Sequence, residues 1–195
     1  MTSSPAGRGR PRDERSGAAI IRAAAELVVE SGYAAMSIGA VAARAGVGKD
    51  TLYRRWPGKP ELVYEAVFTT ADTAKLPDTG SVEGDLTAVV QSLVEEFSAP
   101  AAAAALPGLL ADFAATPQLR ATIRSRFLQP AKERLVAVFD RAEQRGETTA
   151  DLPVDLVLDT LAGAVFFHLG IIGERPEPDL ARRIAAMIAK GIEAR

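Results

Sequence analysis

The chain has 195 residues, of which 48% are hydrophobic, and this is enough to bury a sizeable core. Lysine and arginine number 23 against 25 aspartate and glutamate residues, so the overall charge points to no particular partner. The absence of cysteine excludes disulfides, thiolate metal sites and cysteine catalysis. The polar, basic N-terminus lacks the pattern of a signal peptide, and we expect a cytoplasmic protein.

Residues 1–15 are predicted to be a disordered basic arm, because they contain too little apolar surface to fold alone. The run Arg8-Gly9-Arg10-Pro11 resembles the core of an AT-hook, a short arm that lies in the minor groove of A·T-rich DNA. Arginine suits that groove because its negative potential is enhanced there. A basic tail without sequence preference is the alternative. Both interpretations assign DNA contacts to Arg8, Arg10 and Arg12.

Residues 37–55 are predicted to form two short helices joined by a tight turn. Ser37 can cap the first helix, and Gly46 can adopt the left-handed conformation that the sharp helix end needs. The second helix is expected to bury Leu52 and Trp56. Its outward side carries cations, a hydroxyl and an aromatic ring, which is typical of a helix-turn-helix that enters the major groove of DNA. These outward residues are Lys49, Thr51, Tyr53, Arg54 and Arg55.

Two further helices are expected beside this motif, over residues 18–31, where Gly32 ends the helix, and over residues 60–73. The charge distribution supports a separate domain over residues 16–74. Up to residue 60 there are ten Lys and Arg against five Asp and Glu, whereas the remainder has thirteen against twenty. A polyanion would be attracted to the basic N-terminal part and repelled from the rest.

The remainder, residues 75–195, is predicted to be helical throughout, since no segment shows the sustained alternation of a half-buried strand. Ser81 can cap the first of these helices, Pro107 is expected to break or bend the second, and Pro130 should perturb the third. The fold class is therefore all-α, with nine helices in total. The five helices expected here cover residues 82–98, 101–115, 117–145, 152–172 and 178–193.

The run A-G-V-x-x-x-T-L-Y-x-x-W-P-x-K-x-E-L, within residues 18–66, closely resembles the DNA-binding signature of the TetR family of bacterial transcriptional regulators. The turn, core and surface positions of the motif agree together, which makes the signal specific. The resemblance implies an N-terminal DNA-binding domain followed by a ligand-binding and dimerisation bundle over residues 75–195. It also implies nine helices, the number expected above.

The resemblance assigns roles to individual residues of the recognition helix. Lys49 and Asp50 match positions that face base edges, where lysine can donate to guanine and aspartate can accept from cytosine. Thr51 and Tyr53 match positions that contact phosphates or thymine methyl groups. Arg54 and Arg55 flank them and are expected to read guanine or to hold the backbone.

The residues around the recognition helix are expected to hold the DNA backbone. Lys59 matches a lysine that anchors a phosphate at a helix N-terminus, and Ser37 and Arg44 are expected to contact the backbone as well. Two glycines depart from the family pattern. Gly48 stands where serine or threonine usually caps the recognition helix, and Gly39 stands where some relatives carry a longer, base-reading side chain.

In the family the last two helices pair with their counterparts in a second subunit, which implies a homodimer. One candidate stripe is Leu156, Thr160, Gly163, Ala164, Phe167 and Ile171, and the other is Ile184, Met187, Ile188 and Ile192; an intramolecular core is the alternative for both. A dimer suits a palindromic operator, because two half-sites lie about 34–36 Å apart. An effector pocket is expected between the helices. Its candidate lining is Phe97, Leu110, Phe113, Ile123, Phe127, Phe139, Phe166 and His168.

The sequence therefore predicts a repressor that binds a palindromic operator and is released by a small apolar or aromatic effector. A DNA-binding architectural protein without an effector is the alternative. An enzyme is not expected, because His168 is the single imidazole and neither a nucleophile elbow nor a phosphate loop is present. No cofactor or metal site is expected. Asp155, Asp159 and His168 interrupt the apolar run of residues 152–172, which argues against a membrane span.

Overall fold

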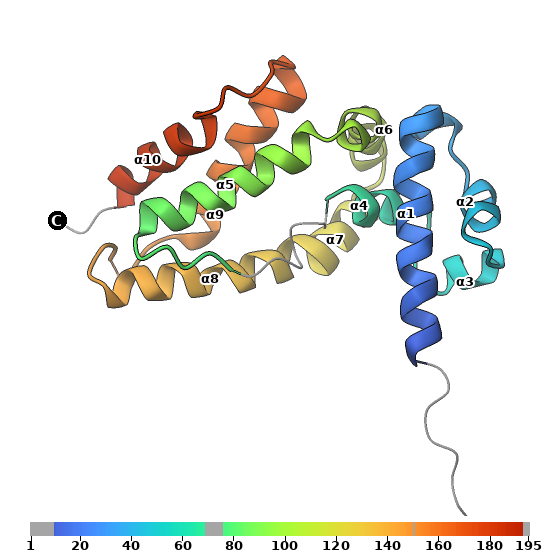
Figure 1. Cartoon of the computed structure of the whole chain (residues 1–195), viewed down its shortest axis with the longest axis horizontal. Coiled ribbons are helices and arrows are strands. Elements are labelled where there is room, and N and C mark those ends of the chain that lie inside the picture. Colours follow the sequence, from blue (N-terminus) through green and yellow to red (C-terminus); the bar gives the residue numbers. More distant parts are fainter. Residues whose placement is uncertain (1–9, 69–75, 150, 193–195) are drawn as a thin grey trace, which may run out of the picture.

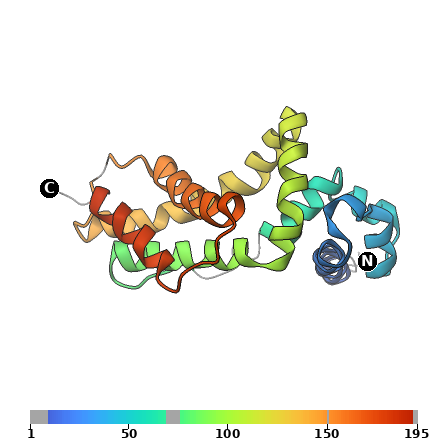
Figure 2. The same cartoon turned by 90° about the horizontal axis from the view of Figure 1, so that it is seen from above.

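The computed structural model describes residues 10–68, 76–149 and 151–192, and the elements in these ranges are helices. They form an elongated molecule with the N-terminal head, α1 to α4, at one end and the body, α5 to α10, making up the rest (Figures 1 and 2). The continuous runs α7–η2–α8 and α9–η3 each count as one helix, so the described residues contain nine helices, as predicted. The predicted domain boundary at residue 74 lies outside the described residues.

The first helix of the head, α1 (Arg10–Ala35), begins earlier than expected. Residues 10–15, predicted to belong to a disordered arm, are helical, and Pro11 stands in the first turn, where its missing N–H is not needed. Gly32 interrupts the helix as predicted, with a φ of 79° and a ψ of 163°. Arg8 lies outside the described residues, so the shape of the predicted minor-groove arm stays a prediction.

The helix-turn-helix consists of α2 (Ile38–Ala45) and α3 (Lys49–Tyr53), followed by α4 (Lys59–Phe68). The Ser37 hydroxyl accepts a hydrogen bond from the Ala40 N–H at 3.2 Å, which confirms the predicted cap. Gly46 ends α2 in the left-handed region at a φ of 66°. The α3 helix stops two residues before its predicted end. Leu52 and Trp56 are fully buried, so α3 and the segment after it are anchored in the head core.

The body begins with α5 (Val82–Ser98), which Ser81 caps as predicted by accepting a hydrogen bond from the Gly84 N–H. The chain then bends by 80° into α6 (Pro100–Ala115), and α6 runs through Pro107 without ending there. The sharp change of direction therefore lies before Pro100. A proline such as Pro100 is tolerated in the first turn of a helix better than in the helix interior. Figure 2 shows α6 lying across the molecule where the body meets the head.

The rest of the body completes a bundle around α5. The third helix expected from the sequence is divided into α7 (Pro117–Ile123), a π-helical turn η2 (Arg124–Leu128) and α8 (Gln129–Gln144), so the perturbation predicted at Pro130 falls just before it. The last elements are α9 (Val154–Val165), the π-helical η3 (Phe166–Ile172) and α10 (Leu180–Ile192). Side chains from α5, α8, α9 and α10 form one continuous body core.

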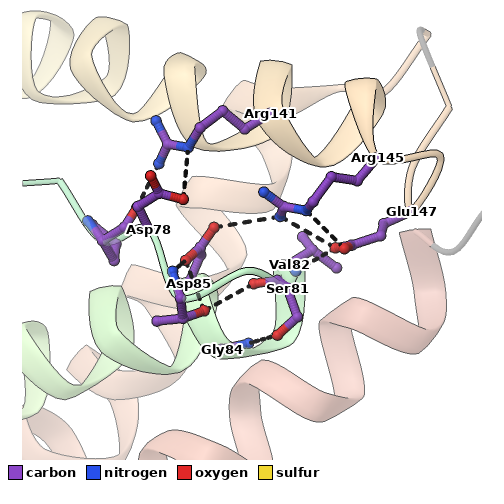
Figure 3. A network of polar contacts seen from close by, with 10 residues as sticks. Asp78, Ser81, Val82, Gly84, Asp85, Arg141, Arg145 and Glu147 are labelled. Carbon is purple, nitrogen blue, oxygen red and sulfur yellow. Dashed lines mark hydrogen bonds and ion pairs between the residues drawn. The ribbon is translucent and has the colours of Figure 1, made fainter.

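A polar network joins the start of α5 to the end of α8 (Figure 3). The Asp85 carboxylate is fully buried and accepts hydrogen bonds from the Thr79 N–H at 2.6 Å and from the Thr79 hydroxyl at 2.9 Å. Arg145 lies 3.5 Å from the other Asp85 oxygen and donates to Glu147 at 2.8 Å. Glu147 in turn accepts from the Val82 N–H, an otherwise unpartnered donor of the first helical turn. The network therefore fixes the segment after the head to the body.

Candidate DNA-binding surface and effector cavity

The outward side of α3 presents the side chains expected to read DNA. Lys49, Asp50, Tyr53, Arg54 and Arg55 are exposed, Tyr53 by 54%, whereas Thr51 is half-buried. They share this surface because the helix turns its single large apolar residue, Leu52, inward. An exposed aromatic ring among cations forms a surface that a nucleic acid can bind without any rearrangement of the buried core.

Two glycines of the head, Gly39 and Gly17, leave room for lysine and arginine side chains. A Cβ at Gly39 would lie 3.0 Å from the Lys49 Cε atom, so the lysine chain lies back over α2 in the space that a larger residue at position 39 would need. A Cβ at Gly17 on α1 would lie 2.1 Å from an Arg55 guanidinium nitrogen, which no real contact allows. The small residues thus determine how the two cations are placed on this surface.

The cations beside the recognition helix are already held by other groups of the head. Arg44 forms a two-pronged ion pair with Glu30, at 2.6 and 2.7 Å, and this hydrogen bonding lowers the pKa of Glu30 and raises that of Arg44. To bind Arg44, a DNA phosphate would have to displace the Glu30 carboxylate. Lys59 donates to the Ala34 carbonyl at 3.3 Å, and its Nζ lies 4.3 Å from the centre of the Tyr33 ring.

Tyr33 connects Lys59 to the body. Its hydroxyl donates to the carboxylate of Asp112 on α6, and burial together with this bond raises the pKa of Tyr33 far above its ordinary value. On the α6 side, a Cβ at Gly108 would lie 2.1 Å from the Tyr33 ring, so the ring lies directly on the α6 backbone. Lys59, which is expected to hold a phosphate, is therefore positioned by Tyr33, a residue of α1 whose hydroxyl is bonded to the body.

The body encloses a cavity of about 850 Å³ next to the head. Six aromatic rings line it, and neighbouring ring centres are between 5.2 and 6.3 Å apart. Spacings of this size are favourable for offset or edge-on ring pairs. Tyr64 and Phe68 come from α4, a head helix, and the other four rings come from α5, α6, η2 and η3. These four are Phe97, Phe113, Phe127 and Phe166.

The structure places six of the eight expected pocket residues on this cavity, namely Phe97, Leu110, Phe113, Ile123, Phe127 and Phe166. Phe139 and His168 do not line it. Phe139 is only 4% exposed and belongs to the body core, because α8 turns that face toward α5 and α9. The His168 imidazole points elsewhere and lies 3.8 Å from the Glu174 carboxylate.

Several cavity residues were not predicted from the sequence. Tyr64 and Phe68 were assigned to the head alone, although their spacing of four places both on one face of α4. The lining is also more polar than the eight candidates suggested. Its charged members, which no periodicity marks as cavity residues, are Glu96, Arg124, Lys132, Arg134 and Asp159. Lys132 and Asp159 form an ion pair at 2.7 Å.

The two stripes proposed for subunit contacts differ in exposure. On α9 and η3, Leu156, Phe167 and Ile171 are 63%, 58% and 54% exposed, and Thr160 and Gly163 lie with them on the surface, whereas Ala164 is half-buried. The α10 stripe largely faces inward. Ile184, Ile188 and Ile192 pack into the body core, which is the intramolecular alternative, and only Met187 remains exposed.

A basic four-helix head with a helix-turn-helix, joined to a larger helical body with a cavity, is typical of a DNA-binding transcriptional regulator. Comparison with known families agrees with this class. Residues 20–66 match the model of bacterial regulatory proteins of the tetR family, and residues 76–188 match the tetracyclin repressor-like C-terminal domain. The chain belongs to the TetR family of transcriptional regulators, whose members are DNA-binding proteins rather than enzymes.

Individual proteins show the same similarity over nearly the whole chain. The uncharacterised HTH-type transcriptional regulator YdeS of Bacillus subtilis is 30% identical over 188 residues, which are 96% of this chain and 94% of the relative. The DNA-binding transcriptional repressor TetR of Mycobacteroides abscessus is 30% identical over 165 residues, or 83% and 85% of the two chains. The crystal structure of the TetR family regulator SCO0332 superposes with a TM-score of 0.74 at 25% identity, over 91% and 98% of the chains.

Proposed function

We propose that this regulator is a repressor that binds a palindromic operator as a homodimer and is released by a small effector in the body cavity. The observation that carries the proposal is the position of α4. This helix begins with Lys59, which is expected to hold a phosphate, and continues with Tyr64 and Phe68, which line the cavity. An occupant of the cavity therefore touches the head directly.

The proposed contacts with DNA are those expected from the sequence. Lys49, Asp50 and Tyr53 face outward on α3 and would meet base edges and the backbone in the major groove, with Arg54 and Arg55 beside them. Ser37, Arg44 and Lys59 would hold phosphates on either side. Arg8, Arg10 and Arg12 would extend the contact toward the minor groove. The relative from Mycobacteroides abscessus, 30% identical over 83% of this chain, is described as a repressor, which supports the proposed repression.

The proposed dimer uses the exposed stripe of α9 and η3, with Met187 of α10 beside it. An apolar stripe of this kind on an otherwise charged protein is typical of a contact with another protein. By length and composition the run Val154–Ile172 could also cross a membrane. We favour the dimer and a cytoplasmic location, because Asp155 and Asp159 lie on the same helix and the family acts on DNA.

The proposed effector is a small molecule with an apolar or aromatic body. A volume of about 850 Å³ lies within the range of about 300–1,000 Å³ that is usual for pockets of small organic ligands. Six rings offer stacking partners, and the charged groups around Arg124 and Glu96 can orient a polar end of the ligand. We propose neither a catalytic role nor a cofactor or metal.

The test has two steps. Selection of bound sequences from random DNA should yield inverted repeats whose half-sites are about one helical turn apart. A thermal-shift screen of aromatic and apolar compounds should then yield a stabilising ligand that also lowers operator affinity in a gel-shift titration. If such ligands stabilise the protein without weakening DNA binding, or if none stabilises it, the protein is an architectural DNA-binding protein without an effector.

A further inference from the structure

We propose that Arg126 couples the cavity to the recognition helix by holding Glu65, and through Glu65 the end of α3, in one defined position. Arg126 lies in the π-helical turn η2 of the body, and Glu65 lies on α4 of the head. The inference rests on the proposed function in that the cavity binds an effector and α3 binds DNA. It adds the particular contact through which the two sites communicate.

One guanidinium bridges two elements of the head. An Nη of Arg126 donates to the backbone carbonyl of Arg55 at 2.8 Å, and the other donates to the Glu65 carboxylate at 3.1 Å. The fork of the guanidinium is suited to this, because it holds two donors in fixed relative positions. The side chains of Arg126 and Glu65 are only 32% and 17% exposed, so solvent screens the pair less than an ordinary surface pair.

Glu65 passes the contact on to the end of the recognition helix. Its carboxylate accepts a hydrogen bond from the Trp56 indole N–H at 2.8 Å and lies 3.8 Å from the Arg55 guanidinium. That guanidinium lies 5.0 Å from the centre of the Trp56 ring. A displacement of Glu65 would therefore change how Arg55 and Trp56 are held directly after α3.

The same two residues are each next to a ring of the cavity. Tyr64 precedes Glu65, Phe127 follows Arg126, and the centres of these two rings are 5.2 Å apart on the cavity wall. A ligand ring inserted between them would have to move α4 and η2 apart. That movement would separate Glu65 from Arg126. The π-helical turn η2 is the site of this movement. Such turns are rare in proteins as a whole, but those that exist are found frequently at functional sites.

Figure 1 shows why the connection runs through α4. This helix lies between α1 of the head and α7 at the near end of the body, so it is packed by both parts. The second contact between the parts, from Tyr33 on α1 to Asp112 on α6, does not involve the end of α3. Of the polar contacts described between head and body, those of Arg126 reach the segment that directly follows the recognition helix.

Trp56 provides a reporter for this contact, because it is the single tryptophan of the chain. Its indole N–H gives one resonance in a ¹H–¹⁵N spectrum, and that proton bonds to Glu65. We would titrate the full-length protein with 1-anilinonaphthalene-8-sulfonate, an aromatic dye whose fluorescence rises on entering an apolar site, and follow dye binding and the indole resonance together. Ala88→Phe, which fills part of the cavity lining, should weaken dye binding and so locate the site.

In the wild type the indole resonance should move as the dye saturates. In Arg126→Gln the movement at saturation should be largely lost, because Glu65 is then no longer held by η2. Arg126→Lys should lose as much, because it keeps the charge but not the two fixed donors. Arg175→Gln is the control. It removes the same charge from an exposed position of the body outside the cavity lining, so it should keep both the dye affinity and the full movement at saturation.

The outcomes separate this inference from the proposed function. If the dye binds and the resonance does not move, or moves as far in Arg126→Gln and Arg126→Lys as in the wild type, the coupling through Arg126 is wrong while the effector cavity stands. If the dye does not bind, or binds Ala88→Phe as well as the wild type, the cavity is not the effector site. The coupling then falls together with that part of the proposed function.

Discussion

Replacing Phe167 with glutamate should separate the proposed dimer without unfolding the subunit. The Phe167 side chain is 58% exposed on η3, at the centre of the α9–η3 stripe. A phenylalanine offers about 200 Å² for burial, so a partner that covers the exposed part removes about 115 Å² from water in each subunit. At about 25 cal/mol per Å² this contributes about 3 kcal/mol per subunit and about 6 kcal/mol per symmetric dimer, as an upper limit.

Loss of that contribution would raise the dimer dissociation constant by as much as about 10⁴-fold, and two buried carboxylates would weaken the dimer further. Sedimentation equilibrium measures this constant, and circular dichroism shows whether the melting curve of the subunit is retained. Val29→Glu is the matched control, because Val29 is 51% exposed on α1 of the head, far from the stripe. An unchanged dissociation constant in Phe167→Glu would refute the proposed interface.

Three further outcomes are expected. Tyr53→Ala or Lys59→Ala should weaken operator binding in a gel-shift titration by about 1–3 kcal/mol without unfolding the protein; unchanged affinity would contradict the assigned surface. Deletion of residues 1–14 should reduce affinity most for operators flanked by A·T tracts, and an equal loss on G·C-flanked operators would leave only a non-specific basic tail. Hydrogen bonding to Arg145 lowers the pKa of Glu147. The stability that this pair contributes should therefore be fully present above the ordinary glutamate pKa and be lost as the pH falls through the lowered pKa of Glu147. Glu147→Gln should flatten that part of the pH–stability curve.

The helices of the head could be predicted from the sequence almost completely, because the features that define them depend on residues close together in the chain. Ser37, Gly46 and Leu52 each have a role that depends on neighbours a few residues away: a cap, a left-handed helix end and a buried position. The start of α1 was predicted too late. A run of charged residues gives no apolar periodicity, although the helix there extends beyond the amphipathic segment to Arg10.

The body shows why the site itself was predicted less completely. Phe127, Phe139 and Phe167 have the same chemistry and occupy helices of similar pattern, yet one lines the cavity, one lies in the core and one faces solvent. Periodicity indicates which residues share a helix face, but not what that face meets. The same limit explains Ile184, which the sequence left open between a partner subunit and the core, and Tyr64, whose second role depends on α4 lying against η2.

The size of the cavity also limits how strongly an effector can act. A ligand of about 25 non-hydrogen atoms, at about 0.3 kcal/mol per atom, binds with about 7–8 kcal/mol in total. Moving a two-state protein from 1% to 99% of the released form requires a difference of about 5.5 kcal/mol between the affinities of the two states. Nearly all the binding energy would then have to be specific for one state. That is implausible, because most of the lining belongs to body helices that also pack in the body core, and only Tyr64 and Phe68 come from the head. We therefore expect a saturating effector to lower operator affinity by about 5–150-fold, the range of ordinary allosteric coupling. A loss near 10⁴-fold in the gel-shift titration would mean that the cavity is largely rebuilt when the head is released.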